Sequence, residues 1–397
     1  MKEKLAKEKT TVPPHGGTLK NLMIDDPGEK KELIGESRDL PGIKLSTLEF
    51  SDLIMLGTGA FSPLEGFMVS SDYEGVLKDM KLPSGTLWPL PVTITVKDRD
   101  KYRPGDRAAL ISPYSDEIVG QILVEDIYTY DKEAESLASF GTYDPSHPGA
   151  EKLKSLGDYH IGGKVKVFSE GGYPDEFPQY GRPSETREIF AQKGWKTIVA
   201  FQTRNPIHRS HEYLTKTVLE VFDGLFIHPI VGKLKKGDIP GPIRIKCYEA
   251  LLDNYYPSGR AVLKVYPMEM RYAGPKEAVL HAIIRQNYGC THIIIGRDHA
   301  GVGNFYGAFD AQDIFATLKD SDLLIKPVKM DWTFYCESCG GMASFKTCPH
   351  PDSDHKMISG TKLREMLSNG QYPPEYITRK EVSDILIDYY KGLENKE

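Results

Sequence analysis

Short apolar runs alternate with longer amphipathic segments through the second half of the chain. In the longer segments apolar residues recur three or four positions apart, which is the spacing of one helix face. Strand and helix in alternation predict a parallel sheet with helices on its faces. The predicted strands are 197–201, 225–231, 261–266, 292–295 and 324–328, and the predicted helices are 208–222, 243–253, 276–287 and 308–318. In such sheets ligands bind beyond the carboxyl ends of the strands, where the strand order reverses.

The first 180 residues follow a different pattern, with Pro and Gly turn signals between short runs typical of strands. This spacing predicts a β-rich, barrel-like domain. The runs include 90–96, 108–111 and 118–124. A turn-rich segment at 172–183 is where we expect this domain to end.

A third pattern begins after the last predicted strand, where three cysteines lie close together and helices are predicted at 361–368 and 380–393. We therefore expect a β-rich domain at 1–180, an α/β domain at 181–330 and a small C-terminal region at 331–397. The length of 397 residues agrees with at least two domains, because single domains usually have ~100–200 residues.

Composition and charge exclude several classes of protein. Hydrophobic residues make up 40% of the chain and charged residues 27%, as in folded globular proteins. A net charge of −6 gives no general attraction to nucleic acid or to an acidic membrane surface, so an anion site must be local. No apolar run approaches the ~18–20 residues that span a bilayer, and the start lacks the apolar core of a secretory signal. We expect a cytoplasmic protein that binds neither membrane nor nucleic acid.

The first strand of the predicted sheet leads directly into a polar segment with two histidines. Asn205 followed by Pro206 predicts a helix start, with Asn205 as the N-cap and Pro206 at the first helical position. His208 and His211 then lie within the first two turns and on one face. Because the free N–H groups of a helix N-terminus attract phosphate, both imidazoles are candidates to lean toward an anion above the sheet.

Gln202, Thr203 and Arg204 lie at the carboxyl end of that strand. The guanidinium of Arg204 offers a fork of donors that suits a tetrahedral oxyanion, and Gln202 adds an amide donor. Any one of these residues, or either histidine, would by itself be interpreted as an ordinary polar or surface residue. Their concentration at one strand-to-helix junction favours an anion-binding site instead.

A second junction follows the predicted strand 292–295. Glycine there lets the backbone approach a ligand closely, and successive N–H groups in such a turn can surround an anion. A glycine-rich turn is more often structural, but one that also contains an arginine, an aspartate and a histidine favours a binding loop. The residues concerned are Gly296, Arg297, Asp298, His299, Ala300 and Gly301.

The five cysteines are unevenly spaced. Cys336, Cys339 and Cys348 lie within thirteen residues, and an odd number in such a cluster indicates a metal site before it indicates disulfides. The spacing predicts a closed, structural Zn²⁺ site with a histidine as the fourth ligand. His350 and His355 are both candidates. We prefer His355, because the one-residue gap between Cys348 and His350 leaves little room to wrap around a tetrahedral ion.

Taken in order, these motifs resemble those of the ATP sulfurylase family. They are Gln-Thr-Arg-Asn at 202–205, the histidine pair at 208 and 211, and Gly-Arg-Asp-His-Ala-Gly at 296–301. Further matches are the segments 14–19, 231–232, 236–238 and 270–278, together with Arg244, Tyr248, Ser359, Gly360, Thr361 and Arg364. The resemblance extends over most of the chain, and some bacterial and archaeal members have a similar cysteine cluster at this place.

The resemblance implies a Rossmann-like nucleotidyltransferase domain, a PUA-like N-terminal domain and a small zinc-bearing C-terminal region. The implied reaction is direct, in-line attack of sulfate on the α-phosphorus of ATP, which gives adenosine 5′-phosphosulfate and releases pyrophosphate without a covalent intermediate. Mg²⁺ is expected to arrive with ATP. A homo-oligomer, with a dimer favoured, is also expected.

The resemblance also implies roles for residues. Sulfate is expected to contact Gln202, Arg204 and the backbone of Ala300, and the nucleotide is expected to contact Asn205, both histidines and residues 296–299. The expected catalytic residues are Thr203, Arg204, Asn205, His208 and His211, and the expected substrate-binding residues are Gln202, Arg204, Asn205, Gly296, Arg297, Asp298, His299 and Ala300. The residues expected either to gather anions at the mouth of the cleft or to be plain surface charges are Lys233, Lys235, Lys236, Arg271 and Lys276.

Two other functions fit parts of this pattern. An adenylyltransferase with a different acceptor would share both junctions, and sulfate-dependent pyrophosphate release distinguishes it. A zinc-containing RNA-binding protein would explain a PUA-like domain with a cysteine cluster, and it predicts tight, salt-sensitive RNA binding. The net acidic charge and the lack of a basic, aromatic face argue against it. The sequence has no GxxxxGK[ST] P-loop, which argues against a fused adenylylsulfate kinase.

Overall fold

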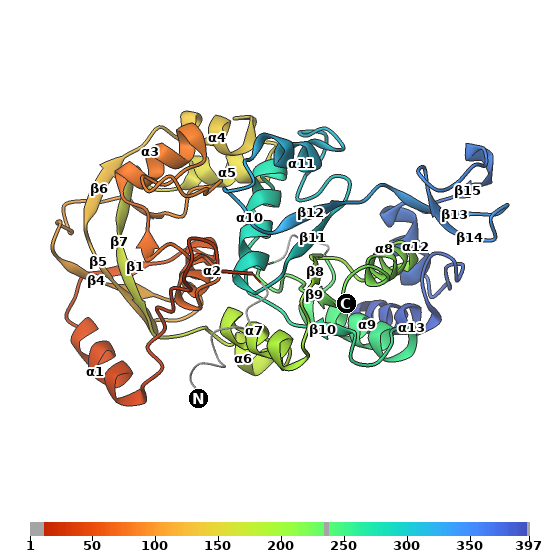
Figure 1. The fold of residues 1–397 in the computed structure, drawn as a ribbon. Coiled ribbons are helices and arrows are strands. Elements are labelled where there is room, and N and C mark those ends of the chain that lie inside the picture. The colour runs from red at the N-terminus through yellow and green to blue at the C-terminus, as the bar shows by residue number, and fades with distance from the viewer. Residues whose placement is uncertain (1–11, 234–237, 395–397) are drawn as a thin grey trace, which may run out of the picture.

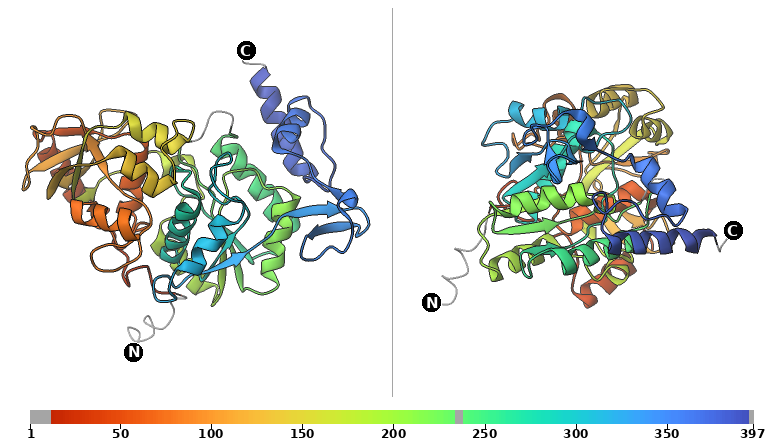
Figure 2. Two further views of the ribbon diagram at one scale, coloured as in Figure 1. Left: turned by 90° about the horizontal axis from the view of Figure 1, so that it is seen from above. Right: turned by 90° about the vertical axis from the view of Figure 1, so that its right-hand side faces the viewer.

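The computed structural model describes residues 12–233 and 238–394, so Lys235 and Lys236 lie outside the described residues. Figure 1 shows three parts in a row: an N-terminal sheet with its helices, a central sheet, and a small C-terminal sheet followed by two helices. Seen from above in Figure 2, the central sheet lies between the N-terminal domain and the C-terminal sheet. The middle part is therefore in contact with both others.

The central sheet is five-stranded, and every neighbouring pair of its strands is parallel, as predicted. Its strands are β8 (Ile198–Phe201), β9 (Gly224–Ile227), β10 (Ala261–Leu263), β11 (His292–Ile295) and β12 (Lys326–Lys329). The order β10-β9-β8-β11-β12 reverses direction between β8 and β11. These are the two strands that precede the predicted binding motifs, so the switch point of the sheet and the candidate chemistry coincide.

Helices cover both faces of this sheet. They are α8 (Arg209–Leu219), α9 (Gly241–Tyr255), α10 (Gly274–Asn287), and the short pair of α11 (Asp310–Asp313) and the 3₁₀ helix η1 (Ile314–Thr317). The single helix predicted at 308–318 is therefore wrong. The Gln312 side chain donates to the carbonyls of Ile295 (3.0 Å) and Met330 (2.8 Å), so the ends of β11 and β12 hold this segment in place of a longer helix.

The helix α10 joins the central sheet to the N-terminal domain and is buried along nearly its whole length. At its end, the Asn287 side chain donates to the carbonyls of Ala60 and Ser62, both at 2.9 Å, and accepts the N–H of His15 at 2.8 Å. His15 belongs to the first motif of the resemblance. That motif therefore fastens two domains together and does not contribute to a binding site.

The N-terminal sheet has the order β1-β4-β5-β7-β2, and β3 and β6 also pair with β7. Its strands are β1 (Gly42–Lys44), β2 (Gly66–Phe67), β3 (Ile94–Val96), β4 (Arg107–Ile111), β5 (Ile118–Leu123), β6 (Asp126–Thr129) and β7 (Tyr159–Val167). The helices up to the next domain are α1 (Pro27–Ser37), α2 (Thr47–Gly57), α3 (Ser70–Asp79), α4 (Lys132–Phe140), α5 (Pro148–Ser155), α6 (Tyr173–Glu176) and α7 (Pro183–Gln192). The sequence pattern predicts the sheet but misses these helices.

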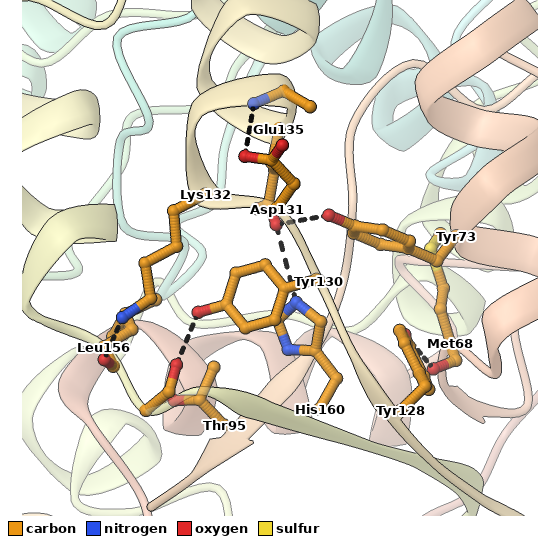
Figure 3. A network of polar contacts seen from close by, with 12 residues as sticks. Met68, Tyr73, Thr95, Tyr128, Tyr130, Asp131, Lys132, Glu135, Leu156 and His160 are labelled. Atoms are coloured by element: carbon orange, nitrogen blue, oxygen red, sulfur yellow. Dashed lines mark hydrogen bonds and ion pairs between the residues drawn. The ribbon is translucent and has the colours of Figure 1, made fainter.

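A buried polar network joins α4 to β6 and β7 (Figure 3). Glu135 accepts the hydroxyl of Tyr73 at 2.8 Å, and His160 Nε2 lies 3.4 Å from the same carboxylate oxygen. Tyr130 stacks on His160, with ring centroids 3.7 Å apart, and donates to the carbonyl of Gly157 at 2.7 Å. Burial and the nearby carboxylate hold the pKa of Tyr73 far above its usual value, so its hydroxyl remains a donor.

The C-terminal region has an antiparallel sheet of order β14-β13-β15 and then two helices. Its elements are β13 (Thr333–Cys336), β14 (Gly341–Ser344), β15 (His355–Lys356), α12 (Gly360–Ser368) and α13 (Lys380–Glu394). Leu363 and Leu386 from these helices share one hydrophobic core with Tyr248 and Leu251 of α9. Within the described residues, no helix has both the length and the apolar composition to cross a membrane.

Candidate active site and metal cluster

A cavity of about 690 Å³ opens at the carboxyl ends of β8 and β11. Both predicted junctions line it, and the C-terminal region adds a third wall. The lining includes Gln202, Thr203, Arg204, Asn205, His208 and His211 from the first junction, Gly296, Arg297, Asp298, His299 and Ala300 from the second, and Trp332, Tyr335, Lys356, Met357 and Tyr376 from the third wall. The structure thus brings every residue expected to touch substrate to one cavity.

The helix after β8 begins later than the sequence predicts. It starts at Arg209 with His208 in the N-cap position, so the predicted N-cap at Asn205 is wrong. Two hydrogen bonds hold Asn205 in a turn instead. Its N–H donates to Thr203 Oγ1 at 3.1 Å, and its carbonyl accepts the hydroxyl of Tyr248 at 2.5 Å. Asn205 therefore lines the cavity from this turn and not from the helix.

His208 and His211 lie side by side at the start of α8, with ring centroids 5.8 Å apart. The main-chain N–H of His208 donates to His211 Nδ1 at 3.2 Å, so a neutral His211 ring carries its proton on Nε2. His208 Nδ1 is buried without a partner. Burial, and secondarily His211, lowers the pKa of His208 to about 3, and burial lowers that of His211 to about 4. Both rings are therefore neutral hydrogen-bonding groups at neutral pH.

Arg204 supplies the positive charge of the first junction. Its guanidinium carbon lies 5.0 Å from the ring centroid of Tyr272, and its Nη1 is buried without a hydrogen-bond partner. An unpartnered guanidinium nitrogen is a strong donor for an anion. Tyr272 has a left-handed backbone (φ 60°), and its carbonyl accepts the hydroxyl of Tyr306 at 2.9 Å. Contacts outside the cavity therefore fix the ring on which Arg204 lies.

The turn at 296–300 presents its backbone to the cavity. Asp298 (φ 54°) and Ala300 (φ 56°) are in the left-handed region, which non-glycine residues rarely adopt. Left-handed residues in such a turn direct successive N–H groups toward one point and can make an anion-binding concavity. The N–H groups of His299 and Ala300 donate no hydrogen bond within the part of the chain that the structure describes. Both remain available to a ligand.

The third wall contains residues that the sequence analysis missed. The guanidinium carbon of Arg297 lies 3.7 Å from the ring centroid of Trp332, and its Nε lies 3.0 Å from Asp298 Oδ2. Tyr335 and Tyr376 stack with ring centroids 4.6 Å apart. Only Trp332 had a usable signal, because it follows β12 and thus lies near another carboxyl strand end.

Other residues of the resemblance have structural contacts away from the cavity. Arg271 is buried and forms an ion pair with Asp52 at 2.6 Å, so its expected place at the mouth of the cleft is wrong. Arg244 is fully buried and donates to the carbonyls of Ile239 (2.9 Å) and Ile230 (2.8 Å). The other described residues expected at the mouth, Lys233 and Lys276, do not line the cavity either.

Three cysteines and a histidine form a cluster of potential metal ligands. The ligand atoms of Cys336, Cys339, Cys348 and His350 all lie within 4.8 Å of one another. Cys339 Sγ lies 3.7 Å from Cys348 Sγ, and His350 Nδ1 lies 3.2 to 3.7 Å from the three sulfurs. Around a tetrahedral Zn²⁺ ion, ordinary bond lengths give S–S edges of ~3.8 Å and S–N edges of ~3.6 Å. The four side chains therefore fit one closed tetrahedral ion.

His355, preferred from the sequence as the fourth ligand, is outside this group. Its ring stacks on Phe334, with centroids 3.7 Å apart, and its Nε2 lies 3.4 Å from Cys348 Sγ as a hydrogen-bonding neighbour of the sulfur. The prediction is corrected to His350. The one-residue gap after Cys348 is sufficient because His350 uses Nδ1, the ring nitrogen nearer the backbone.

The fold and the cavity define a class of protein: a nucleotide-binding α/β domain with an anion-binding cavity at the switch point of its parallel sheet. The family model described as ATP-sulfurylase matches residues 179–389, and the model described as a PUA-like domain matches residues 12–170. The chain belongs to the ATP-sulfurylase family.

Individual relatives match over almost the entire chain. It is 52% identical to a sulfate adenylyltransferase of Desulforamulus reducens over 387 residues, which cover 96% of this chain and 99% of that protein. It is 48% identical to a sulfate adenylyltransferase of Pelodictyon phaeoclathratiforme over 390 residues, which cover 97% and 96%. A solved structure titled "Hexameric APS kinase from Thiobacillus denitrificans" superposes with a TM-score of 0.71 at 26% identity, over 94% of this chain and 68% of that one. The similarity therefore includes both domains and both junctions.

Proposed function

We propose that this protein is a sulfate adenylyltransferase, which joins sulfate to the α-phosphorus of ATP and releases pyrophosphate. One observation carries the proposal: the unpartnered guanidinium nitrogen of Arg204 and the free N–H groups of His299 and Ala300 line one cavity. Two anions that repel each other need such a space, with donors on more than one side. The names of the two bacterial relatives support the same activity.

In this proposal sulfate binds between Gln202, Arg204 and the backbone of Ala300. Arg204 contributes charge and a planar fork of donors, which suits two oxygens of a tetrahedral anion. Its buried Nη1 supports an anionic ligand here, because leaving a charged donor unpaired away from water is costly. Ala300 adds an N–H from the opposite junction, so sulfate is held from two strand ends.

The nucleotide is proposed to bind along Asn205, the two histidines and residues 296–299. His211 presents an N–H on Nε2, because its Nδ1 already accepts a main-chain N–H. Neutral donors stabilise the charge that develops on the phosphates in the transition state. Thr203 accepts the N–H of Asn205 and thereby orients it.

The proposed chemical step is an in-line substitution. A sulfate oxygen forms a bond to the α-phosphorus while the bond to the bridging oxygen of pyrophosphate breaks, and pyrophosphate leaves with the electron pair. Repulsion between sulfate and the triphosphate is the main barrier, so catalysis comes from positioning and from charges directed at the phosphorus and the leaving group. Mg²⁺ enters with ATP as part of the substrate.

Cys336, Cys339, Cys348 and His350 are proposed to hold a structural Zn²⁺ ion. When bound, such an ion cross-links the small sheet, and this sheet supplies part of the third wall of the cavity. We further propose a cytoplasmic location, which the five unpaired cysteines support. A dimer and domain limits near residues 180 and 330 also belong to the proposal, and the hexameric title of the Thiobacillus structure supports self-association.

The test is pyrophosphate release from MgATP by the purified protein, with sulfate, with phosphate, with a phosphorylated sugar, and without acceptor. Sulfate-dependent release with formation of adenosine 5′-phosphosulfate is the expected result. Release that requires the phosphorylated acceptor would identify an adenylyltransferase of different specificity. Salt-sensitive retention of RNA without any turnover would identify the RNA-binding alternative.

A further inference from the structure

A chain of buried polar side chains lies behind the loop at 296–300. Glu277 and His281 are one helical turn apart on α10, and both are fully buried. His281 Nδ1 lies 3.0 Å from Nε2 of His299, and His281 Nε2 lies 3.7 Å from Glu277 Oε1. His281 Nε2 has no hydrogen-bond partner among the described residues, so Glu277 is the polar group that faces it. The carboxylate is therefore connected to the cavity through two imidazole rings in series.

Glu277 is held in place by the turn that precedes α10. Its Oε1 accepts the N–H of Arg271 at 2.9 Å, and its Oε2 accepts the N–H of Ala273 at 3.0 Å. Burial raises the pKa of Glu277, while these two N–H groups and the charges of Arg271 and Arg204 act in the opposite direction. The carboxyl group is thus rigidly placed and able to exist in either protonation state near neutral pH.

The two hydrogen-bonding contacts link the tautomers of both rings to the charge of the carboxyl group. When the three side chains share two protons, Glu277 is ionised, each ring carries its proton on Nε2, and His299 Nδ1 offers a lone pair. With one more proton, His299 Nδ1 becomes a donor. That extra proton is on His299 or, after two protons shift along the chain, on Glu277. In both arrangements Nδ1 of His299 donates.

Charges around the chain determine which form exists with and without a ligand. Burial, and then Arg285, lowers the pKa of His299 to about 3, so the ligand-free protein holds two protons. Burial holds the pKa of His281 well below its usual value, and Arg285, His299, Arg271 and His228 add to this effect. The extra proton therefore cannot remain on His281. An anion in the cavity favours the three-proton form, because it attracts a donor and repels a lone pair.

We propose that Glu277 and His281 are positioning residues that keep His299 with a proton on Nδ1 when a phosphoanion occupies the cavity. The proposal rests on the proposed function, because it deepens the role of His299 at that site. It predicts that pyrophosphate binding is accompanied by proton uptake through these three side chains.

The experiment measures proton uptake by calorimetric titration of the full-length protein with pyrophosphate in buffers of different ionisation enthalpy. The wild type is compared with His281→Leu and with the control His228→Leu. His228 is an equally buried histidine that neither ring nitrogen connects to another group among the described residues. Protonation of pyrophosphate itself is the same in all three proteins and cancels in the comparison.

Wild type and His228→Leu are expected to take up about one proton more than His281→Leu. In ATP synthesis from adenosine 5′-phosphosulfate and pyrophosphate, His281→Leu is expected to lose roughly tenfold or more in kcat/KM, the effect of one charge-assisted hydrogen bond. Equal proton uptake in all three proteins would overturn the proposal. Should His281→Leu not fold, Glu277→Gln gives the same measurement, because an amide cannot take up the proton, and uptake equal to wild type would again overturn it.

The two proposals can fail separately. A wild type without sulfate-dependent turnover contradicts the proposed function, yet its proton uptake with pyrophosphate still tests the chain of side chains. An active wild type whose uptake is unaffected by His281→Leu contradicts only the role of Glu277 and His281.

Discussion

Replacement of Arg204 by alanine is expected to impair the use of sulfate far more than the binding of ATP. Arg204 Nη1 is buried and unpartnered, so it is available to the substrate. Two parallel hydrogen bonds from a guanidinium to a dianion, at ~1.5–3 kcal/mol each, amount to about 3–6 kcal/mol. Since every ~1.4 kcal/mol is tenfold, kcat/KM for sulfate should fall roughly 100-fold to 10,000-fold.

The assay is the initial rate of pyrophosphate release across a series of sulfate concentrations at saturating MgATP. Arg204→Lys keeps the charge but loses the planar fork, so its activity should lie between wild type and Arg204→Ala. Arg209→Ala is a matched control, because Arg209 is in the same segment but does not line the cavity and pairs with Glu212 at 3.6 Å. If Arg204→Ala retained sulfate-dependent turnover within a few-fold of wild type, the sulfate site assigned to it would be wrong.

Three further outcomes are expected. The pKa values of His208 and His211 fall from 6.5 to about 3 and about 4 on folding, so the unfolded chain binds protons first. The free energy of unfolding should therefore decrease below pH ~6.5 by up to about 1.4 kcal/mol per pH unit for each ring, and less in a double glutamine variant, as urea unfolding at pH 5 and 7 will show. Elemental analysis should find roughly one zinc per chain, fewer in Cys339→Ser, with a lower melting temperature after chelation; a metal-free protein of equal heat stability would refute the structural role. Glu135→Ala leaves the buried hydroxyl of Tyr73 without its acceptor, so urea unfolding should show a loss of about 1–3 kcal/mol with kcat unchanged.

The central sheet and its chemistry could be predicted from sequence because both depend on local pattern. β8 and β11 are short apolar runs buried almost throughout, and each ends directly at a polar motif. Parallel strands put these ends at one edge of the sheet, so Arg204 and Ala300 had to lie near each other if the strands were neighbours. Contact between β8 and β11 is the step that only the structure provides.

The errors arose where distant contacts override local preference. Asn205 is a good N-cap by residue type, but the hydroxyl of Tyr248, which comes from another helix, binds its carbonyl. The helix α2 has no apolar stripe to detect, because residues 49–57 are all buried. Trp332 and Tyr335 reach the cavity through the position of the C-terminal sheet, which no spacing in the sequence encodes.

The most direct test of the shared cavity is a crystal structure of the protein with adenosine 5′-phosphosulfate. The sulfuryl oxygens are expected within hydrogen-bonding distance of Arg204 and the N–H of Ala300, with the phosphate beside His208, His211 and the turn at 296–300. A ligand that bound elsewhere, or that touched only one of the two junctions, would contradict the account.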